Sequence, residues 1–405
     1  MINENDILDI YRLEGNLREY NYGQQYLKFK NNNFIKFNPD EFPVHSCTLS
    51  NWKTGKSTPN SIQNINFLKE KKILPFDPCN ISARIVGVLH GDGNLYSNLR
   101  SFGFTSSDKK MLEEIRTDVK TVFKIDTKIT KKREKGETVI IMGKTRKSTK
   151  PTYDLKFNNH ALCLLLYKLG VPKGKKVEQK YLVPEWIING SNEIKIGFLQ
   201  GLFDSELSNF KVHNHLNHKD NINELRLELC KNEKYKDCLI SYLNQIVILL
   251  FNLGIKSRID YPSNYREGYI SFKVVISNQL DNLYKLIQLP GFYYTTYKLR
   301  KSSEVNNLIL EKMENKSIIP DVLKYIIDKN KFRTEDLVKN LKISKSYSTI
   351  VCKFLFKNGF ANRVRRKDYY FDYFPNIPKI EEFLNDPIKL YRIPPIKSAL
   401  NKKIL

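Results

Sequence analysis

The chain is poor in acidic residues, glycine and cysteine for its length of 405 residues. It carries 43 Asp and Glu against 68 Lys and Arg, which leaves a formal charge of +25. A surface with so little acid favours a polyanionic partner, and nucleic acid is the usual one. The six cysteines include no C-x-x-C pair and mostly lie in apolar runs. We therefore expect buried, reduced thiols rather than disulfides or a zinc site.

Long apolar runs and a targeting segment are also missing. The longest apolar stretch, residues 246–251, is far shorter than the roughly 20 residues that cross a bilayer. The N-terminus has neither a basic start nor an apolar core. These absences predict an intracellular, cytoplasmic protein, associated with the nucleoid and without membrane contact. Neither a phosphate-cradling Gly-rich motif nor a Ser/His/Asp signature stands out, whereas 41% hydrophobic residues are enough for packed cores.

The order of predicted elements divides the chain into five parts. These are a helical unit at 1–75, two similar units at 80–190 and 191–305, a small unit at 317–375 and a basic tail at 376–405. The two similar units both follow the order α-β-β-α-β-β-α, with long amphipathic helices at 108–123 and 236–253. A strand with strict alternation lies at 225–229. Strand pairs between long helices predict an α+β fold with antiparallel sheets.

Two nine-residue segments open the similar units. They are IVGVLHGDG at 85–93 and LQGLFDSEL at 199–207. Each has small residues four apart, Gly87 with Gly91 and Gly201 with Ser205, which places them on one face of a helix. Such a face lets two helix backbones approach closely.

Each of these helices ends in one acid, Asp92 or Glu206, and the two are 114 residues apart. The helix dipole disfavours an acid at this end by roughly 0.3–1 kcal/mol, and two neighbouring acids repel. A divalent cation removes both penalties, and hard oxygen ligands suit Mg²⁺. A metal held in this way can activate water and stabilise the leaving oxygen of a phosphodiester. Two ordinary buried helices with chance acids are the alternative interpretation.

The paired segments resemble the LAGLIDADG motifs of homing endonucleases in their single-chain, two-motif form, over residues 80–305. The resemblance implies two pseudo-symmetric αββαββα halves, with the motif helices at their interface and the sheets forming a saddle over DNA. It further implies that Asp92 and Glu206 bind Mg²⁺, assisted by the backbone carbonyls of Gly91 and Ser205. The expected activity is cleavage of both strands of a long specific double-stranded DNA site by a monomer.

Such enzymes also tend to supply a lysine near the end of each half. The best matches are Lys176 and Lys298, with Lys180 as a rival in the first half, and charge stabilisation or water positioning is the expected role. Plain solvated lysines are the alternative. Two departures stand out: His90 replaces an acid that usually acts structurally, and Leu207 replaces a glycine. Forcing Leu207 into a left-handed helix stop would cost roughly 1–2 kcal/mol. Asn209 is the alternative turn residue and would move the exit by two residues, so full double-strand activity is in doubt.

The flanking units resemble DNA-reading modules. Residues 47–59 resemble the recognition helix and exit turn of a helix-turn-helix, which lays its first residues on the edges of the major groove, with Trp52 turned into the core. The expected contacts there are Ser50, Asn51, Lys53 and Lys56. Residues 317–375 resemble a winged helix. The residues expected on DNA are Lys345, Ser346, Tyr347, Arg363, Arg365 and Arg366. An unrelated three-helix fragment and a winged helix used for protein contact are the alternatives.

Three further hypotheses stay open. The first is a non-catalytic transcription regulator on the same scaffold, and the second is an RNA-splicing maturase. The third concerns basic residues 128–150, which form either a hairpin arm on phosphates or a solvated loop. His213, His215 and His218 lack an obvious further metal ligand and are expected in a DNA-facing loop. Because residue 1 is Met and a terminal His-Asn is missing, we expect a free-standing, intron-encoded or intergenic protein of a mobile element rather than an intein.

Overall fold

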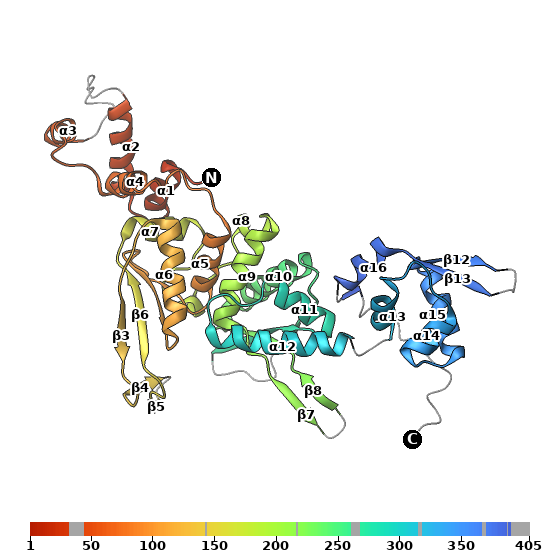
Figure 1. Ribbon diagram of the computed structural model, residues 1–405. Coiled ribbons are helices and arrows are strands. Elements are labelled where there is room, and N and C mark those ends of the chain that lie inside the picture. Colours follow the sequence, from red (N-terminus) through yellow and green to blue (C-terminus); the bar gives the residue numbers. More distant parts are fainter. Residues whose placement is uncertain are drawn as a thin grey trace. The chain divides into compact units, whose positions relative to one another are not determined.

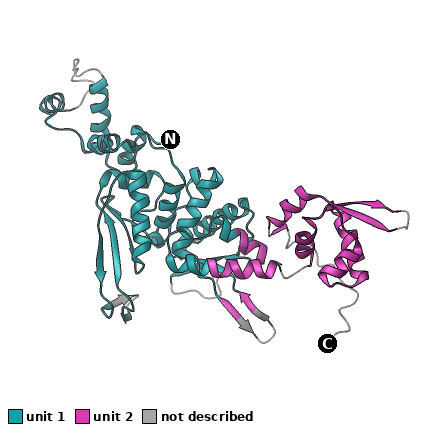
Figure 2. Cartoon of the chain, in the orientation of Figure 1, with its two compact units in different colours: residues 1–211, 223–277, 286–302 teal, residues 212–222, 278–285, 303–405 magenta. Residues whose placement is uncertain are grey.

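The computed structural model describes residues 1–31, 44–141, 144–215, 218–260, 268–314, 318–366, 370–386 and 388–389. Helices and antiparallel strand pairs make up these residues, which confirms the predicted α+β class. The chain separates into two compact units (Figure 2). Unit 1 holds residues 1–211, 223–277 and 286–302, and unit 2 holds residues 212–222, 278–285 and 303–405. None of the described helices has the length and apolar character needed to span a membrane.

Unit 1 begins with four helices (Figure 1). They are α1 (Glu4–Leu13), α2 (Leu17–Asn31), α3 (Ser46–Lys53) and α4 (Asn60–Glu70). Trp52 is 3% exposed and packs edge-on against Tyr22 and Tyr26, so its predicted place in the core is confirmed. Helices α1 and α4 pack against α7, and an ion pair of 2.9 Å joins Asp6 to Lys168. The helical segment is therefore docked on the residues that follow it.

Residues 80–190, the first half, build a four-stranded antiparallel sheet in the order β1-β2-β6-β3. The elements are α5 (Asn80–His90), β1 (Asn94–Leu95), β2 (Phe102–Ser106), α6 (Lys109–Phe123), β3 (Ile129–Arg133), β4 (Thr138–Ile141), β5 (Lys144–Lys147), β6 (Thr152–Phe157), α7 (His160–Lys168), the short helix η1 (Lys176–Glu178) and α8 (Glu185–Ile188). Strands β4 and β5 form a separate hairpin inserted between β3 and β6 (Figure 1). The predicted basic segment 128–150 falls on β3 and this hairpin.

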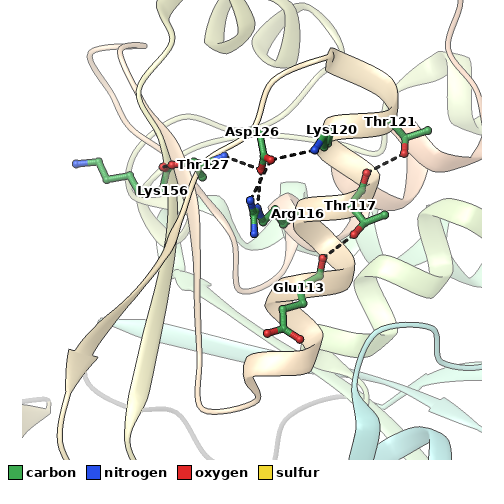
Figure 3. Close-up of polar contacts among 8 residues, drawn as sticks. All are labelled: Glu113, Arg116, Thr117, Lys120, Thr121, Asp126, Thr127 and Lys156. Carbon is green, nitrogen blue, oxygen red and sulfur yellow. Dashed lines mark hydrogen bonds and ion pairs between the residues drawn. The ribbon is translucent and has the colours of Figure 1, made fainter.

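The turn from α6 into β3 is fixed by a cluster around Asp126 (Figure 3). Its carboxylate accepts from Arg116 at 2.5 and 2.9 Å and from Lys120 at 3.2 Å. The Arg116 hydrogen bond in particular holds the pKa of Asp126 well below its usual range. The hydroxyl of Thr127 donates to the carbonyl of Lys156 on β6 at 3.1 Å. Helix and sheet edge are thus tied together beside the basic strand β3.

Residues 191–305, the second half, build a three-stranded antiparallel sheet in the order β10-β11-β9. The elements are α9 (Asn192–Glu206), β9 (Leu225–Asn232), the short helix η2 (Glu233–Tyr235), α10 (Lys236–Asn252), β10 (Ser257–Asp260), β11 (Tyr269–Ile276), α11 (Leu280–Gln288) and α12 (Thr296–Glu314). Strand β9 pairs with β11 along its whole length, from Leu225 opposite Ile276 to Asn232 opposite Tyr269. The segment that leaves α9 contacts β9 through a β-bridge between Leu207 and Leu227 and through a hydrogen bond from the Ser208 amide to the Arg226 carbonyl.

Besides residues 280–285 of α11 and 303–314 of α12, unit 2 holds one hairpin from the middle of the sequence and the C-terminal elements. These are β7 (Val212–His215), β8 (His218–Ile222), α13 (Ile319–Ile326), α14 (Thr334–Leu341), α15 (Lys345–Lys357), β12 (Ala361–Arg365), β13 (Phe371–Pro375) and α16 (Ile377–Leu384). Buried Phe332, Leu355, Phe360 and Tyr373 lie in the core of the helices and the β12–β13 hairpin. The Ser344 side chain accepts from the Tyr347 amide and begins α15. Most of the predicted basic tail, from residue 390 on, lies outside the described residues.

Candidate catalytic site at the paired helix ends

Helices α5 and α9 pack along each other through their glycines (Figure 1). A Cβ on Gly87 would clash with the Phe198 carbonyl and lie 2.9 Å from the Leu202 nitrogen. A Cβ on Gly201 would clash with the Arg84 carbonyl and lie 2.8 Å from the Val88 nitrogen. The same spacing of 114 residues separates Gly87 from Gly201 and Arg84 from Phe198. The two contacts are therefore reciprocal.

The C-terminal ends of the two helices meet at Gly91 and Ser205. A Cβ on Gly91 would lie 2.8 Å from the Ser205 hydroxyl and 3.2 Å from Cγ of Glu206. This contact brings Asp92 and Glu206 together. Burial, followed by the negative charge of Asp92, raises the pKa of Glu206 to about 7. The pKa of Asp92 is also raised, by the packing around its carboxyl group, although its side chain reaches solvent.

The two predicted lysines lie at the same helix ends. Lys176 donates from Nζ to the Gly91 carbonyl and, at 2.5 Å, to the Gly93 carbonyl. Lys298 donates to the carbonyls of Phe203, Asp204 and Leu207 at 2.8, 2.8 and 2.7 Å. An ammonium at a helix C-terminus is favoured by the dipole. The positive charges of both lysines partly oppose the rise in the carboxyl pKa values of Asp92 and Glu206.

Burial acts on these ammonium groups as well. It lowers the pKa of Lys176 to about 8 and also lowers that of Lys298, because a charged group loses hydration there. Lys180, the rival for the first half, is exposed. The structure therefore brings Lys176 rather than Lys180 to the carboxylate pair.

The helix end at Leu207 differs from the expectation. Leu207 has φ −75° and ψ 135°, so α9 exits directly into extended backbone. No left-handed residue is needed there, and the strain expected from the missing glycine does not arise. The Lys298 ammonium binds the Leu207 carbonyl and also that of Asp204, which is one of the last carbonyls of α9 that a glycine turn would otherwise satisfy. The change at position 207 is thus no argument against an intact site.

Positions 90 and 204, also 114 residues apart, differ in chemistry. Asp204 accepts from the backbone amides of Tyr293, Tyr294 and Thr295 at 3.0, 2.8 and 2.9 Å. His90 instead faces the Gly170 carbonyl at 3.1 Å from Nε2. Burial lowers the pKa of His90 to about 3, so its ring is neutral. His90 is thus an internal packing residue rather than a metal ligand.

A cavity of about 760 Å³ lies beside Asp92. Its walls include the ends of β2 and the start of α6 and α12. The charged residues around it are Asp92, Asp108, Lys109, Lys110, Lys150, Asp204 and Arg300. A phosphate entering this cavity meets basic side chains next to the carboxylate pair.

The donor set at the helix ends fits a hard divalent cation. The pKa values of both carboxyl groups are raised, that of Glu206 partly by the charge of Asp92, so both gain from a shared positive charge. Mg²⁺ commonly uses one or two carboxylates and keeps waters. Among the described residues no group of three or more His, Cys, Asp or Glu side chains is placed to hold a metal. The Gly91 carbonyl, a predicted ligand, accepts from Lys176, so a cation there competes with that ammonium.

The predicted DNA contacts of the flanking segments are mainly accessible. In α3 and the turn after it, Ser50, Lys53 and Lys56 are exposed and Asn51 is half-buried. In unit 2 the exposed residues are Lys345, Ser346, Arg363 and Arg365, and the half-buried ones are Tyr347 and Arg366. Arg363 stacks on Phe356 and Phe371. The side chains of His215 and His218 lie outside the described residues.

Sequence reasoning missed one charged residue near the site, Lys231. It is 1% exposed, on the buried face of β9, where Leu225 and Leu227 also point. The strict alternation of this strand places residue 231 on the same face as those leucines, so the signal was present in the pattern.

Comparisons with known proteins give distant relatives, and no family model matches the chain. The tRNA-splicing ligase RtcB of Methanocaldococcus jannaschii is 26% identical over 339 residues, which cover 80% of this chain and 33% of the relative. The DNA-directed RNA polymerase subunit Rpo1N of that organism is 28% identical, covering 79% and 23%. Its Replication factor C small subunit is 23% identical, covering 85% and 18%. The chain spans about a third or less of each of these relatives.

Similar solved structures include DNA endonucleases. I-DmoI in complex with DNA and Ca is 16% identical with a TM-score of 0.33, covering 55% of this chain and 96% of that one. The LAGLIDADG homing endonuclease I-LtrWI bound to target DNA is 11% identical with a TM-score of 0.33, covering 58% and 92%. Full-length WhiA from Thermatoga maritima is 12% identical with a TM-score of 0.31, covering 80% and 96%. At these scores the likeness is too weak to assign a function.

Proposed function

We propose that the protein is a metal-dependent endonuclease that hydrolyses phosphodiester bonds in both strands of a long, specific double-stranded DNA site. One observation carries this proposal: Asp92 and Glu206 meet at adjoining helix ends, where burial and then the negative charge of Asp92 raise the pKa of Glu206 to about 7. The pKa of Glu206 stays raised although Lys176 and Lys298 lie nearby, so a further positive charge, such as a divalent cation, would stabilise the ionised pair. The cavity beside Asp92, whose lining includes three lysines and Arg300 as well as acids, supplies an approach for a phosphate.

Asp92 and Glu206, with the carbonyls of Gly91 and Ser205, are the groups that would hold Mg²⁺. When bound, Mg²⁺ lowers the pKa of water and stabilises negative charge on a phosphate. Lys176 and Lys298 add positive charge at the two helix ends, where charge develops on the phosphate oxygens. Because the pKa of Lys176 is about 8, this residue exchanges a proton readily near neutral pH.

The excess of basic residues supports binding to a polyanion before any chemistry takes place. A formal charge of +25 steers DNA to the protein and releases counterions from its backbone. Within unit 1 the lysines around the cavity would contact phosphates near the carboxylate pair. In unit 2 exposed Lys345 and Arg365 lie at the start of α15 and on β12, the elements expected to contact DNA.

The curated relatives support a mobile element. Each of the three matches about four fifths of this chain, so any two of the matched stretches overlap. Their names denote an RNA ligase, an RNA polymerase subunit and a replication factor, so the shared stretch is unlinked to any one of these activities. A segment that recurs in such different proteins can move between genes. Cleavage of DNA at a specific site is a reaction by which a segment moves in this way.

A DNA-binding regulator without cleavage is the second candidate. The observation in its favour is the hydrogen bond from Lys176 to the Gly91 carbonyl, because this ammonium already occupies one predicted metal ligand. An internal cation of this kind would stabilise the helix ends without Mg²⁺.

Cleavage of a random-site plasmid library separates the two candidates. We expect the full chain to linearise specific members in Mg²⁺ and to leave them intact in EDTA. Asp92→Asn and Glu206→Gln should retain DNA binding and abolish cutting, whereas Asp237→Asn, at an exposed acid on α10, should cut normally. Specific retention of library members without any cutting would favour the regulator, and cutting at the wild-type rate by Asp92→Asn would overturn the assignment of the acids.

A further inference from the structure

The two lysine segments at the site are anchored by opposite chemistry. The backbone leading to Lys298 is held by carboxylates: Asp204 accepts from the amides of Tyr293–Thr295, and Asp108 accepts from the amide of Thr296 at 3.0 Å. Asp108 lies just after β2 of the first half, so this bond crosses from one half to the other. In the first half the position equivalent to Asp204 is His90. Its ring faces the Gly170 carbonyl, so it does not hold the Lys176 segment in the way that Asp204 holds the Lys298 segment.

A buried lysine takes the anchoring role for the other segment. Lys231 donates from Nζ to the Lys176 carbonyl at 2.9 Å and to the Gln179 carbonyl at 2.7 Å. These two carbonyls bracket η1, the single turn that carries Lys176. Lys231 stands at the end of β9 in the second half, so this contact also crosses between the halves. A buried ammonium is costly unless it is hydrogen-bonded, and here the acceptors are backbone oxygens of that one turn.

Aromatic side chains limit where this ammonium can lie. The centroid of the Tyr181 ring lies 3.6 Å from Nζ of Lys231, and the ring packs edge-on against Tyr242. Tyr242 in turn is hydrogen-bonded to His90 Nδ1 at 3.2 Å. His90 is the last residue of α5, one residue before Gly91. The packing thus runs without a gap from the Lys231 ammonium to the end of the motif helix.

We propose that Lys231 is a positioning residue for Lys176: it fixes η1 from the opposite half, so that the Lys176 ammonium is aimed at the end of α5 beside Asp92. The role in catalysis rests on the proposed endonuclease function, whereas the positioning itself does not. The consequence is that each half holds the active lysine of the other, through Asp108 in one direction and Lys231 in the other.

Single-turnover cleavage of a target recovered from the plasmid library tests the catalytic part. Lys231→Met keeps the side-chain length and removes the two hydrogen bonds, so we expect a rate about 10- to 100-fold below wild type, as misplacement of a reacting group commonly causes. Lys234→Met, at an exposed lysine three residues along, should cut at the wild-type rate. Lys176→Met combined with Lys231→Met should be no slower than Lys176→Met alone. Full additivity of the two losses would overturn the proposal.

Hydrogen–deuterium exchange of the same variants tests the positioning without relying on cleavage. In Lys231→Met, amides of residues 174–181 should exchange faster while those of β9 and β11 keep their protection, which also shows that the variant is folded. Unchanged exchange in residues 174–181 would overturn the proposal even if the wild type cuts DNA. If these amides exchange faster in Lys231→Met and the wild type cuts no DNA, the positioning role is supported and the endonuclease function is refuted.

Discussion

Gly91 lies against Ser205 with no room for a side chain between them, since a Cβ there would sit 2.8 Å from the Ser205 hydroxyl. Each residue immediately precedes an acid of the candidate site. The close approach of the backbones is therefore what places the Asp92 and Glu206 carboxylates beside each other. The packing of α5 on α9 therefore also determines that the charged pair forms.

The reciprocal glycine contacts predict a loss of stability on adding a methyl group. Gly87→Ala and Gly201→Ala should each lower the free energy of unfolding by about 1–3 kcal/mol, because the clashing atoms belong to backbone and cannot turn aside. Urea denaturation measures the change. Gln200→Ala, next to Gly201 on α9 but half-exposed, is the matched control and should be nearly neutral. Equal stability of all three variants would mean that the helices are not in such close contact.

The raised pKa of Glu206 predicts a pH-dependent cost. Because the pKa rises from 4.5 to about 7 on folding, the folded state holds this proton more tightly, and the stabilisation is lost as pH rises from about 4.5 through 7. At about pH 8 Glu206→Gln should be more stable than the metal-free wild type by up to about 3 kcal/mol. Urea denaturation in EDTA across this range measures the difference. A less stable Glu206→Gln at about pH 8 would contradict a repelled carboxylate pair.

Divalent cations should reverse that cost. At about pH 8 both carboxylates are ionised, so Ca²⁺ or Mg²⁺ at 100 times its Kd should stabilise the fold by about 2.7 kcal/mol. At about pH 6 the cation must first displace the Glu206 proton, and its apparent affinity should fall about tenfold. Thermal shift titrations at the two pH values measure the effect, with Asp92→Asn/Glu206→Gln as the control. An equal shift in the double variant would place the cation elsewhere.

DNA affinity should fall steeply with salt, and unit 2 should contribute to the slope. Lys345→Gln and Arg365→Gln each remove one exposed positive charge, so each should reduce the slope of log K against log salt by about one. Fluorescence anisotropy with a labelled duplex measures the slope. Lys69→Gln, whose ammonium is paired with Glu4 at 2.6 Å, should leave the slope unchanged. A slope unaffected in all three variants would remove unit 2 from the DNA contacts.

Local patterns predicted most elements closely. The helix expected at 108–123 is α6, begun by the Asp108 side chain on the Met111 amide, and the alternating strand at 225–229 is the first part of β9. Strand β2 starts only at Phe102, after a turn in which Leu99 adopts φ 55°. The start of α3 is capped by His45, whose ring accepts from the Cys47 amide.

Apolar periodicity, small residues at a four-residue spacing and one acid after each helix were readable from the residue order, because each depends on neighbours within a few positions. Partners distant in the sequence decided the rest. The pKa of Glu206 depends on burial and on Asp92, the extended exit at Leu207 is stabilised by Lys298, and Lys231 reaches η1 from the other half. Desolvation and charge interaction act through space, so only the folded chain sets their strength.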